Sequence, residues 1–236
     1  MLLQYTQGGF LIIRPQDDPC RIVDAMLKTG YSEEFCVALN FDSCFIARLM
    51  EAGFLVMSSR IEEEETPVSG EHFILLPKLH LTRSILLFDN LHIKKSIKRH
   101  LNRFELRFDT DFDVILDRCL EIHGDGWLTP PLVTAIRDIR RDKIYEAYPV
   151  SFGLYQNGKL VAGEFGVTVG KVYTSYSGYY DESNAGTVQL IFTTHYLQQH
   201  GFAFFDLGMP LDYKADLGAL DVSPQEFVEL FRASVQ

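Results

Sequence analysis

An aspartate at the end of an apolar run is the first residue of this sequence that could do chemistry. Asp206 closes the run FAFFD within residues 202–208, and an apolar run of this length is typical of a buried strand. A carboxylate in such a place is costly unless it has partners, because burial disfavours an unpaired charge. Asp206 therefore belongs either to a functional site, where it would orient or deprotonate a substrate group, or to a structural cap of the following loop.

A group of cations in residues 92–107 is the second candidate. The segment HIKKSIKRHLNRFELR contains six Lys and Arg residues and one acid, although the chain as a whole has a formal net charge of −10. That net charge argues against a protein that coats nucleic acid nonspecifically. If residues 93–103 form a helix, the spacing places four cations broadly on one side, either as a solvated face or as a surface for phosphates: Lys94, Lys98, Arg99 and Arg103.

Aromatic residues are the third candidates. Trp127, in the segment GDGWLT, is either a core residue or a platform on which an unpaired base stacks. Three further candidates follow on an expected strand, where alternate residues share a face. Without a bulge, Tyr173 and Ser177 would therefore lie on one face and Tyr176 on the other.

Composition limits the remaining classes of protein. The 236 residues are 47% hydrophobic, enough for one sizeable core and a small additional domain. The four cysteines form no C-x-x-C pair, so the sequence favours buried thiols over a zinc or redox site. The first ten residues lack the features of a signal peptide, and no apolar run approaches the roughly 20 residues of a membrane span, so we expect a cytoplasmic protein.

The expected elements indicate two domains, residues 1–70 and 71–236. The acidic run 62–65 and the turn residues 66–70 predict an exposed connection between them. Residues 19–28 and 42–52 are expected helices of a small N-terminal α/β domain, with Asp42 or Ser43 as an N-cap. The expected strands 72–77 and 84–89 follow the connection.

The second domain is predicted to have an α+β fold built around an antiparallel meander. Asn157-Gly158 between two alternating runs is a strong hairpin signal, and a second break at Val169-Gly170 gives a third strand within residues 150–180. The other expected elements are helices at 93–103, 111–123, 129–142, 187–200 and 223–233, and strands at 104–109 and 202–208. This order is the one expected of a GNAT-like acyltransferase domain.

Five ordered segments resemble the leucyl/phenylalanyl-tRNA–protein transferase family, and the similarity runs from about residue 81 to the end. They are LHIKKSIKR (91–99), GDGWLT (124–129), GKLVAGEFGVTVG (158–170), SNA (183–185) and FFDLGMPLDYKADLGA (204–219). The resemblance implies transfer of leucine or phenylalanine from charged tRNA to the N-terminal Lys or Arg of an acceptor protein, which marks that protein for degradation.

The resemblance also implies roles for the candidate residues. Asp206 would be catalytic, the cations would contact the tRNA acceptor stem, and a pocket would hold the aminoacyl 3′ end of the tRNA. That pocket would include Met57, Trp127, Tyr173, Tyr176 and Ser177. The aminoacyl ester is already activated and an α-amino group has a reference pKa of about 7.7–8.0, so the reaction requires no metal, cofactor or covalent nucleophile.

Some residues depart from the family pattern. Gly208 stands where the family has a glutamine, Tyr176 where it has a glutamate, and Met57 where it has a tryptophan. Two other readings therefore stay open. One is a noncatalytic relative that binds tRNA or a protein partner. The other is an acyl-CoA-dependent acetyltransferase, although residues 181–188 contain a single glycine for binding a pyrophosphate.

Overall fold

The computed structural model describes residues 3–61 and 72–235. These residues form two compact units: unit 1 comprises residues 1–81 and 123–147, and unit 2 comprises residues 82–122 and 148–236. The expected exposed connection at 62–70, and with it the predicted boundary at residue 70, lies outside the described residues. No helix among the described residues is long and apolar enough to cross a membrane.

Unit 1 contains the two helices expected near the N-terminus. Helix α1, Pro19–Thr29, begins at Asp18, whose carboxylate accepts hydrogen bonds from two backbone N–H groups, and ends at Gly30 in the left-handed conformation. Helix α2, Ser43–Glu51, begins at Asp42, which is the predicted N-cap. Both helices are therefore confirmed.

The strands of unit 1 form two small sheets. Strand β1, Leu11–Ile12, pairs in parallel with β2, Cys36–Val37, and β3, Leu55–Ile61, pairs antiparallel with β4, His72–Lys78. The sequence did not predict β3, because Ser58, Ser59 and Arg60 interrupt its apolar pattern. Helix α5, Pro130–Asp142, also belongs to this unit and begins at Thr129 as expected.

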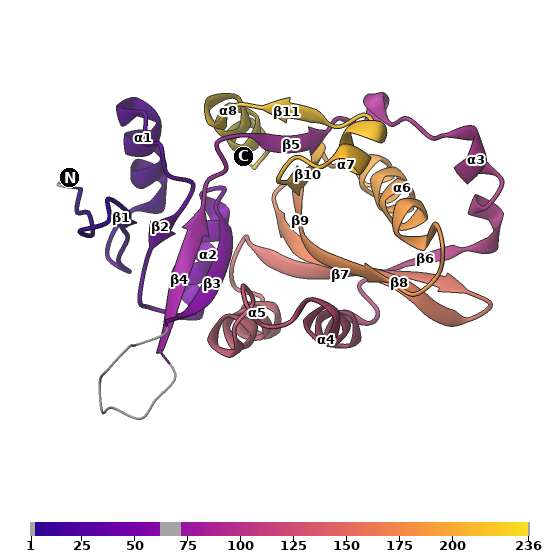
Figure 1. The fold of residues 1–236 in the computed structure, drawn as a ribbon, viewed down its shortest axis with the longest axis horizontal. Helices are drawn as coiled ribbons and strands as arrows, with labels where there is room; N and C mark the ends of the chain where they lie inside the picture. Colours follow the sequence, from indigo (N-terminus) through magenta and orange to yellow (C-terminus); the bar gives the residue numbers. More distant parts are fainter. Residues whose placement is uncertain (1–2, 62–71, 236) are drawn as a thin grey trace. The chain divides into compact units, whose positions relative to one another are not determined.

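A seven-stranded sheet forms the centre of unit 2 (Figure 1). Its spatial order is β11-β5-β10-β9-β8-β7-β6, and β9 and β10 are its one parallel pair. The strands are β5 (Arg83–Leu86), β6 (Glu105–Phe108), β7 (Tyr148–Gln156), β8 (Lys159–Val169), β9 (Val172–Tyr180), β10 (Phe204–Gly208) and β11 (Leu220–Val222). The predicted α+β class with an antiparallel meander is confirmed.

Helices cover both faces of this sheet. Helix α4, Phe112–His123, and helix α6, Ala185–Gln199, lie on opposite faces of β7 and β8 in Figure 1. Phe112 of α4 contacts Phe165 edge to face, and Leu197 of α6 packs in a core cluster with Phe152 and Tyr173. Helix α8, Pro224–Ser234, starts with the capping box of Ser223 and Glu226.

The prediction of one helix over residues 93–103 is wrong in its length. The structure has a four-residue helix α3, Lys95–Lys98, and a 3-10 turn η2, Leu101–Arg103. Like charges four residues apart, Lys94 with Lys98 and Lys95 with Arg99, repel each other on a continuous helix. The strand expected at 84–89 likewise ends at Leu86 and is followed by the 3-10 turn η1, Phe88–Asn90.

Candidate functional site

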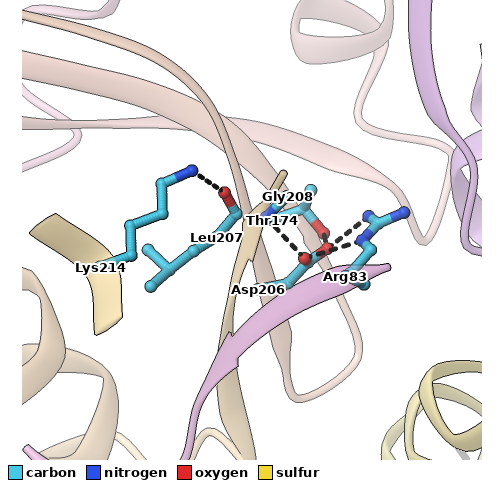
Figure 2. A network of polar contacts seen from close by, with 6 residues as sticks. All are labelled: Arg83, Thr174, Asp206, Leu207, Gly208 and Lys214. Carbon is cyan, nitrogen blue, oxygen red and sulfur yellow. Dashed lines mark hydrogen bonds and ion pairs between the residues drawn. The ribbon is translucent and has the colours of Figure 1, made fainter. Parts of the chain in front are cut away.

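Asp206 lies in a buried ion pair with Arg83 of the neighbouring strand β5 (Figure 2). Arg83 Nε donates to Asp206 Oδ1 at 2.9 Å and Arg83 Nη2 donates to Oδ2 at 2.5 Å, while the two side chains are 1% and 0% exposed. The guanidinium also lies over the ring of Phe227 of α8, 4.1 Å from its centre. The bidentate geometry is the strongest form of this pairing.

Two further donors complete the shell of the Asp206 carboxylate. The Thr174 hydroxyl of β9 donates to Oδ2 at 2.8 Å, and the backbone N–H of Gly208 donates to Oδ1 at 3.1 Å. Asp206 thus connects β5, β9 and the end of its own strand. Beyond the pair Asp206↔Thr174, β10 no longer pairs with β9, which continues to Tyr180. The carboxylate fixes the point at which the two strands separate.

The chain after β10 is held by a lysine of helix α7, Asp212–Asp216. Lys214 Nζ donates to the carbonyl oxygens of Leu207 at 2.6 Å and Met209 at 2.8 Å. Burial lowers the pKa of Lys214 to about 8, an effect that the nearby charges of Asp206 and Glu164 oppose. Between these two carbonyls, Gly208 has φ of 73°, a conformation that favours glycine.

A second buried carboxylate, Glu164 of β8, lies in the same unit. It is 4% exposed, and its Oε2 accepts a hydrogen bond from the Ser175 hydroxyl at 3.1 Å. Burial raises the pKa of Glu164 to about 7. The hydroxyl of Tyr173 lies beside this carboxylate but completes no hydrogen bond of ordinary geometry with it.

A β-bulge changes the expected faces of strand β9. Phe165 pairs with Ser177 and Gly166 with Ser175, so Tyr176 is an extra residue on β9. Tyr173 packs with Phe152 and Phe205 in the core cluster that contains Leu197 of α6. Tyr176 contacts Phe165, which faces α4.

The face shared by Tyr173 and Ser177, which was expected only without a bulge, is therefore not formed. Ser177 lies near the thiol of Cys119 on α4, whereas Tyr173 lies on the α6 side. The structure thus places Tyr173 apart from Tyr176 and Ser177.

The two remaining pocket candidates lie in unit 1. The backbone N–H of Ser58, the residue after Met57, donates to the carbonyl of Trp127 at 2.9 Å. The Ser58 hydroxyl hydrogen-bonds to that of Thr129 at 2.8 Å. Met57 and Trp127, both half-buried, thus belong to two segments that the structure brings together.

The basic segment is exposed in unit 2. Lys94, Lys98, Arg99 and Arg103 all lie at the surface, and Lys94 forms an ion pair with Asp216 at 2.6 Å. Among the described residues, no group of three or more His, Cys, Asp or Glu side chains is placed to hold a metal ion.

Sequence reasoning missed three buried charged residues of unit 2, Arg83, Glu164 and Lys214. Glu164 had a detectable signal, because it is the one acid in the apolar and small run LVAGEFGV. Arg83 and Lys214 had none, because each is a single cation in a short element, and Arg83 lies 123 residues from its partner.

Residues 85–232 match the model of the family described as leucyl/phenylalanyl-tRNA protein transferase. This match defines the class as a tRNA-dependent transferase family with a mixed α+β fold. It covers more than half of the chain, and the chain belongs to the leucyl/phenylalanyl-tRNA–protein transferase family.

Curated relatives carry the same name. The protein of Pseudomonas putida strain W619 is 30% identical over 152 residues, which are 62% of this chain and 66% of the relative. The protein of Azotobacter vinelandii strain DJ is 29% identical over 150 residues, 61% of this chain and 65% of the relative. The chain thus spans slightly less than two thirds of the length of these relatives.

Solved structures are more distant. The crystal structure of FemX is 10% identical and aligns with 94% of this chain and 81% of its own, at a TM-score of 0.49. This similarity is too low to support a conclusion about the present chain.

Proposed function

We propose that this protein transfers leucine or phenylalanine from charged tRNA to the N-terminal amine of acceptor proteins that begin with Lys or Arg, which marks those proteins for degradation. The observation that carries the proposal is the family match over residues 85–232, which contains Asp206 and the basic segment. The expected partners are aminoacyl-tRNA, through its 3′ end and acceptor stem, and the acceptor N-terminus. The reaction would take place in the cytoplasm.

We place the chemistry in unit 2, at the end of β10. Its antiparallel meander, followed by α6 and a strand parallel to β9, supports a GNAT-like acyltransferase domain. Asp206 is the proposed catalytic residue, which orients the reacting groups through its contacts with Thr174 and Gly208. Misplacement of reacting groups by about 1 Å costs roughly 10²-fold in rate, so such orientation is sufficient for a large effect.

In unit 2, the aminoacyl group would contact the pocket candidates of β9. Tyr173, Tyr176 and Ser177 of β9 are the proposed contacts in unit 2, whereas Met57 and Trp127, which belong to unit 1, stay predictions from the family resemblance. Since Tyr173 lies on the α6 side and Tyr176 contacts Phe165 on the α4 side, these two residues would contact different parts of the substrate.

A transfer assay tests this function directly. The purified protein, incubated with leucyl- or phenylalanyl-tRNA and a peptide that begins with Lys or Arg, should increase the peptide mass by one residue. Mass spectrometry measures the product, and an N-acetylated peptide is the matched control, because its amine cannot attack the ester. The proposal is wrong if charged tRNAs of every amino acid leave both Lys- and Arg-initiated peptides unmodified.

Charge reversal tests the basic segment. The double variant Lys98→Glu, Arg99→Glu should bind tRNA more weakly, and the slope of log affinity against log salt should fall by about 2, one for each lost phosphate contact. Because both side chains are exposed, we expect the melting temperature to stay close to that of the unmodified protein.

A matched control makes the same change in charge elsewhere on unit 2. Lys159 and Lys171 are exposed on the meander, outside the basic segment, and the variant Lys159→Glu, Lys171→Glu should retain the salt slope. If both double variants lower the affinity for tRNA equally, the effect is one of net charge alone, and a specific contact with the acceptor stem is refuted.

A further inference from the structure

Three buried polar atoms near the end of β10 have no hydrogen-bond partner among the described residues. They are Oε1 of Glu164 on β8, the hydroxyl of Tyr173 on β9 and Oε1 of Gln189 on α6. Glu164 and Tyr173 lie beside each other, and Thr193, which accepts a hydrogen bond from Gln189 Nε2 at 3.1 Å, lies near the same carboxylate. Buried polar atoms are nearly always paired, and the oxygens of Glu164 and Gln189 are acceptors, so these two atoms point to a ligand that donates hydrogen bonds.

Glycines shape this cluster. A Cβ on Gly166 would lie 2.7 Å from Tyr173 Cε2 and 2.2 Å from the carbonyl oxygen of Thr174. The ring of Tyr173 therefore crosses Gly166, the second residue after Glu164. Gly178 pairs opposite Glu164, and a Cβ there would approach the Glu164 Cβ at 3.4 Å. The two glycines let Glu164 and Tyr173 share one space.

The cluster lies at the point where β9 and β10 separate. Ser175, which binds the other oxygen of Glu164, is the first residue of β9 beyond its last pair with β10, Asp206↔Thr174. Ser175 is half-buried and Gly178, which pairs opposite Glu164, is exposed, so the residues of β9 next to this carboxylate are small and not fully buried. Lys214 lies close enough to both Glu164 and Asp206 for its charge to interact with each of them.

From this geometry we infer that Glu164 is a further catalytic residue, whose free oxygen Oε1 binds the N-terminal amino group of the acceptor polypeptide and takes a proton from it. The inference rests on the proposed function and adds to it the group that receives the acceptor. Asp206, with four donors already bound, would hold the strand end in place.

The proton and bond changes balance without another reactant. The bound ammonium gives one proton to Glu164 and becomes a neutral amine. Its nitrogen attacks the ester carbonyl, so that a C–N bond forms and the bond to the tRNA ribose oxygen breaks. The ribose oxygen leaves with the second proton of the nitrogen, and Glu164 returns its proton to solvent. Near-equal pKa values suit such a transfer, and Glu164 at about 7 lies close to the amine at about 7.7–8.0.

The titratable and polar groups close enough to interact with Glu164 belong to several elements. They are Ser175 and Tyr173 of β9, Thr193 of α6, Tyr213 and Lys214 of α7, and the thiol of Cys119 on α4. Lys214 is the one cation of this set, and its charge favours the ionised form of Glu164. Lys214 stays protonated below its own pKa of about 8. The ionised carboxylate is therefore the form that accumulates as the pH rises through 7.

The variant Glu164→Gln tests the inference through the pH dependence of single-turnover transfer. The unmodified protein should show a rate that rises with a midpoint near pH 7. The variant should be about 10²-fold slower at pH 7.5, and its midpoint should move up by about one unit, towards the pKa of the free amine. The exposed acid Glu182 on the connection from β9 to α6 provides the control, because Glu182→Gln should change neither rate nor midpoint.

Folding does not confound this test. A folded-state pKa raised from 4.5 to about 7 means that ionised Glu164 reduces stability progressively between these pH values. Removal of the charge should therefore leave the melting temperature at pH 7.5 unchanged or higher. If Glu164→Gln nevertheless unfolds, the pH profile of the unmodified protein is the test. A single-turnover rate that does not change between pH 5.5 and 8 overturns the inference. A folded variant with the rate and midpoint of the unmodified protein overturns it as well.

Peptide binding without tRNA separates this inference from the proposed function. The unmodified protein should bind a peptide with a free N-terminus more tightly than its acetylated form, and Glu164→Gln should lose that preference. If the preference depends on Glu164 while no charged tRNA supports transfer, the amine site stands and the transferase function is wrong. If transfer occurs and Glu164→Gln alters neither transfer nor binding, the function stands and the role of Glu164 is wrong.

Discussion

Replacement of Arg83 with methionine is expected to lower the free energy of unfolding by about 3–5 kcal/mol, because one partner of a buried ion pair is removed. Asp206 would remain in the core without the two charge-assisted hydrogen bonds at 2.9 and 2.5 Å. The packing of the guanidinium on Phe227 would also be lost. Chemical denaturation of the full chain, monitored by circular dichroism, measures the change.

An exposed pair with the same N–O distance provides the control. Arg141 binds Asp138 at 2.5 Å, but its side chain is 67% exposed. The variant Arg141→Met should therefore change the free energy of unfolding by less than about 1 kcal/mol. If Arg83→Met costs no more than this control, the ion pair does not hold β5 and β10 together, and our account of the strand end is wrong.

Local signals in the sequence predicted most of unit 2. Asn157 and Gly158 both have positive φ, 50° and 78°, which is the conformation of the two-residue hairpin turn that their types predict. Ser223 is the N-cap of α8, and Glu226 completes its capping box. These features depend on residues within a few positions of each other, which is why sequence reasoning finds them.

Features that depend on distant residues could not be predicted in this way. The burial cost of Asp206 indicated that it needs partners, and four donors confirm this, but nothing local identified Arg83 as one of them. The bulge at Tyr176 arises from the pairing of β9 with β8 and has no signal of its own in the sequence. The sequence therefore predicted where the candidate site lies, at the end of a strand. The structure was needed to identify the residues that contact Asp206 there.

The ion pair also decides how Asp206 can be tested. Asp206→Asn alone leaves the Arg83 charge buried without a partner, so a loss of transfer in that variant would combine folding with function. The double variant Arg83→Met, Asp206→Asn leaves no buried charge from this pair. Its asparagine can still accept from the Gly208 N–H through Oδ1, and its Nδ2 can donate to the Thr174 hydroxyl, so we expect it to be more stable than either single variant.

We expect this double variant to fold and yet to transfer about 10²-fold more slowly than the unmodified protein, because the carboxylate that fixes the separation of β9 and β10 is absent. Single-turnover transfer at pH 7.5, at a temperature well below the unfolding transition, gives the rate. The midpoint of the pH profile should stay near 7, since Glu164 is retained, and this would assign Asp206 to orientation; a shifted midpoint would make it the proton acceptor. If the double variant recovers both the stability and the transfer rate of the unmodified protein, the charge of Asp206 is structural, and the proposed catalytic role of this residue is wrong.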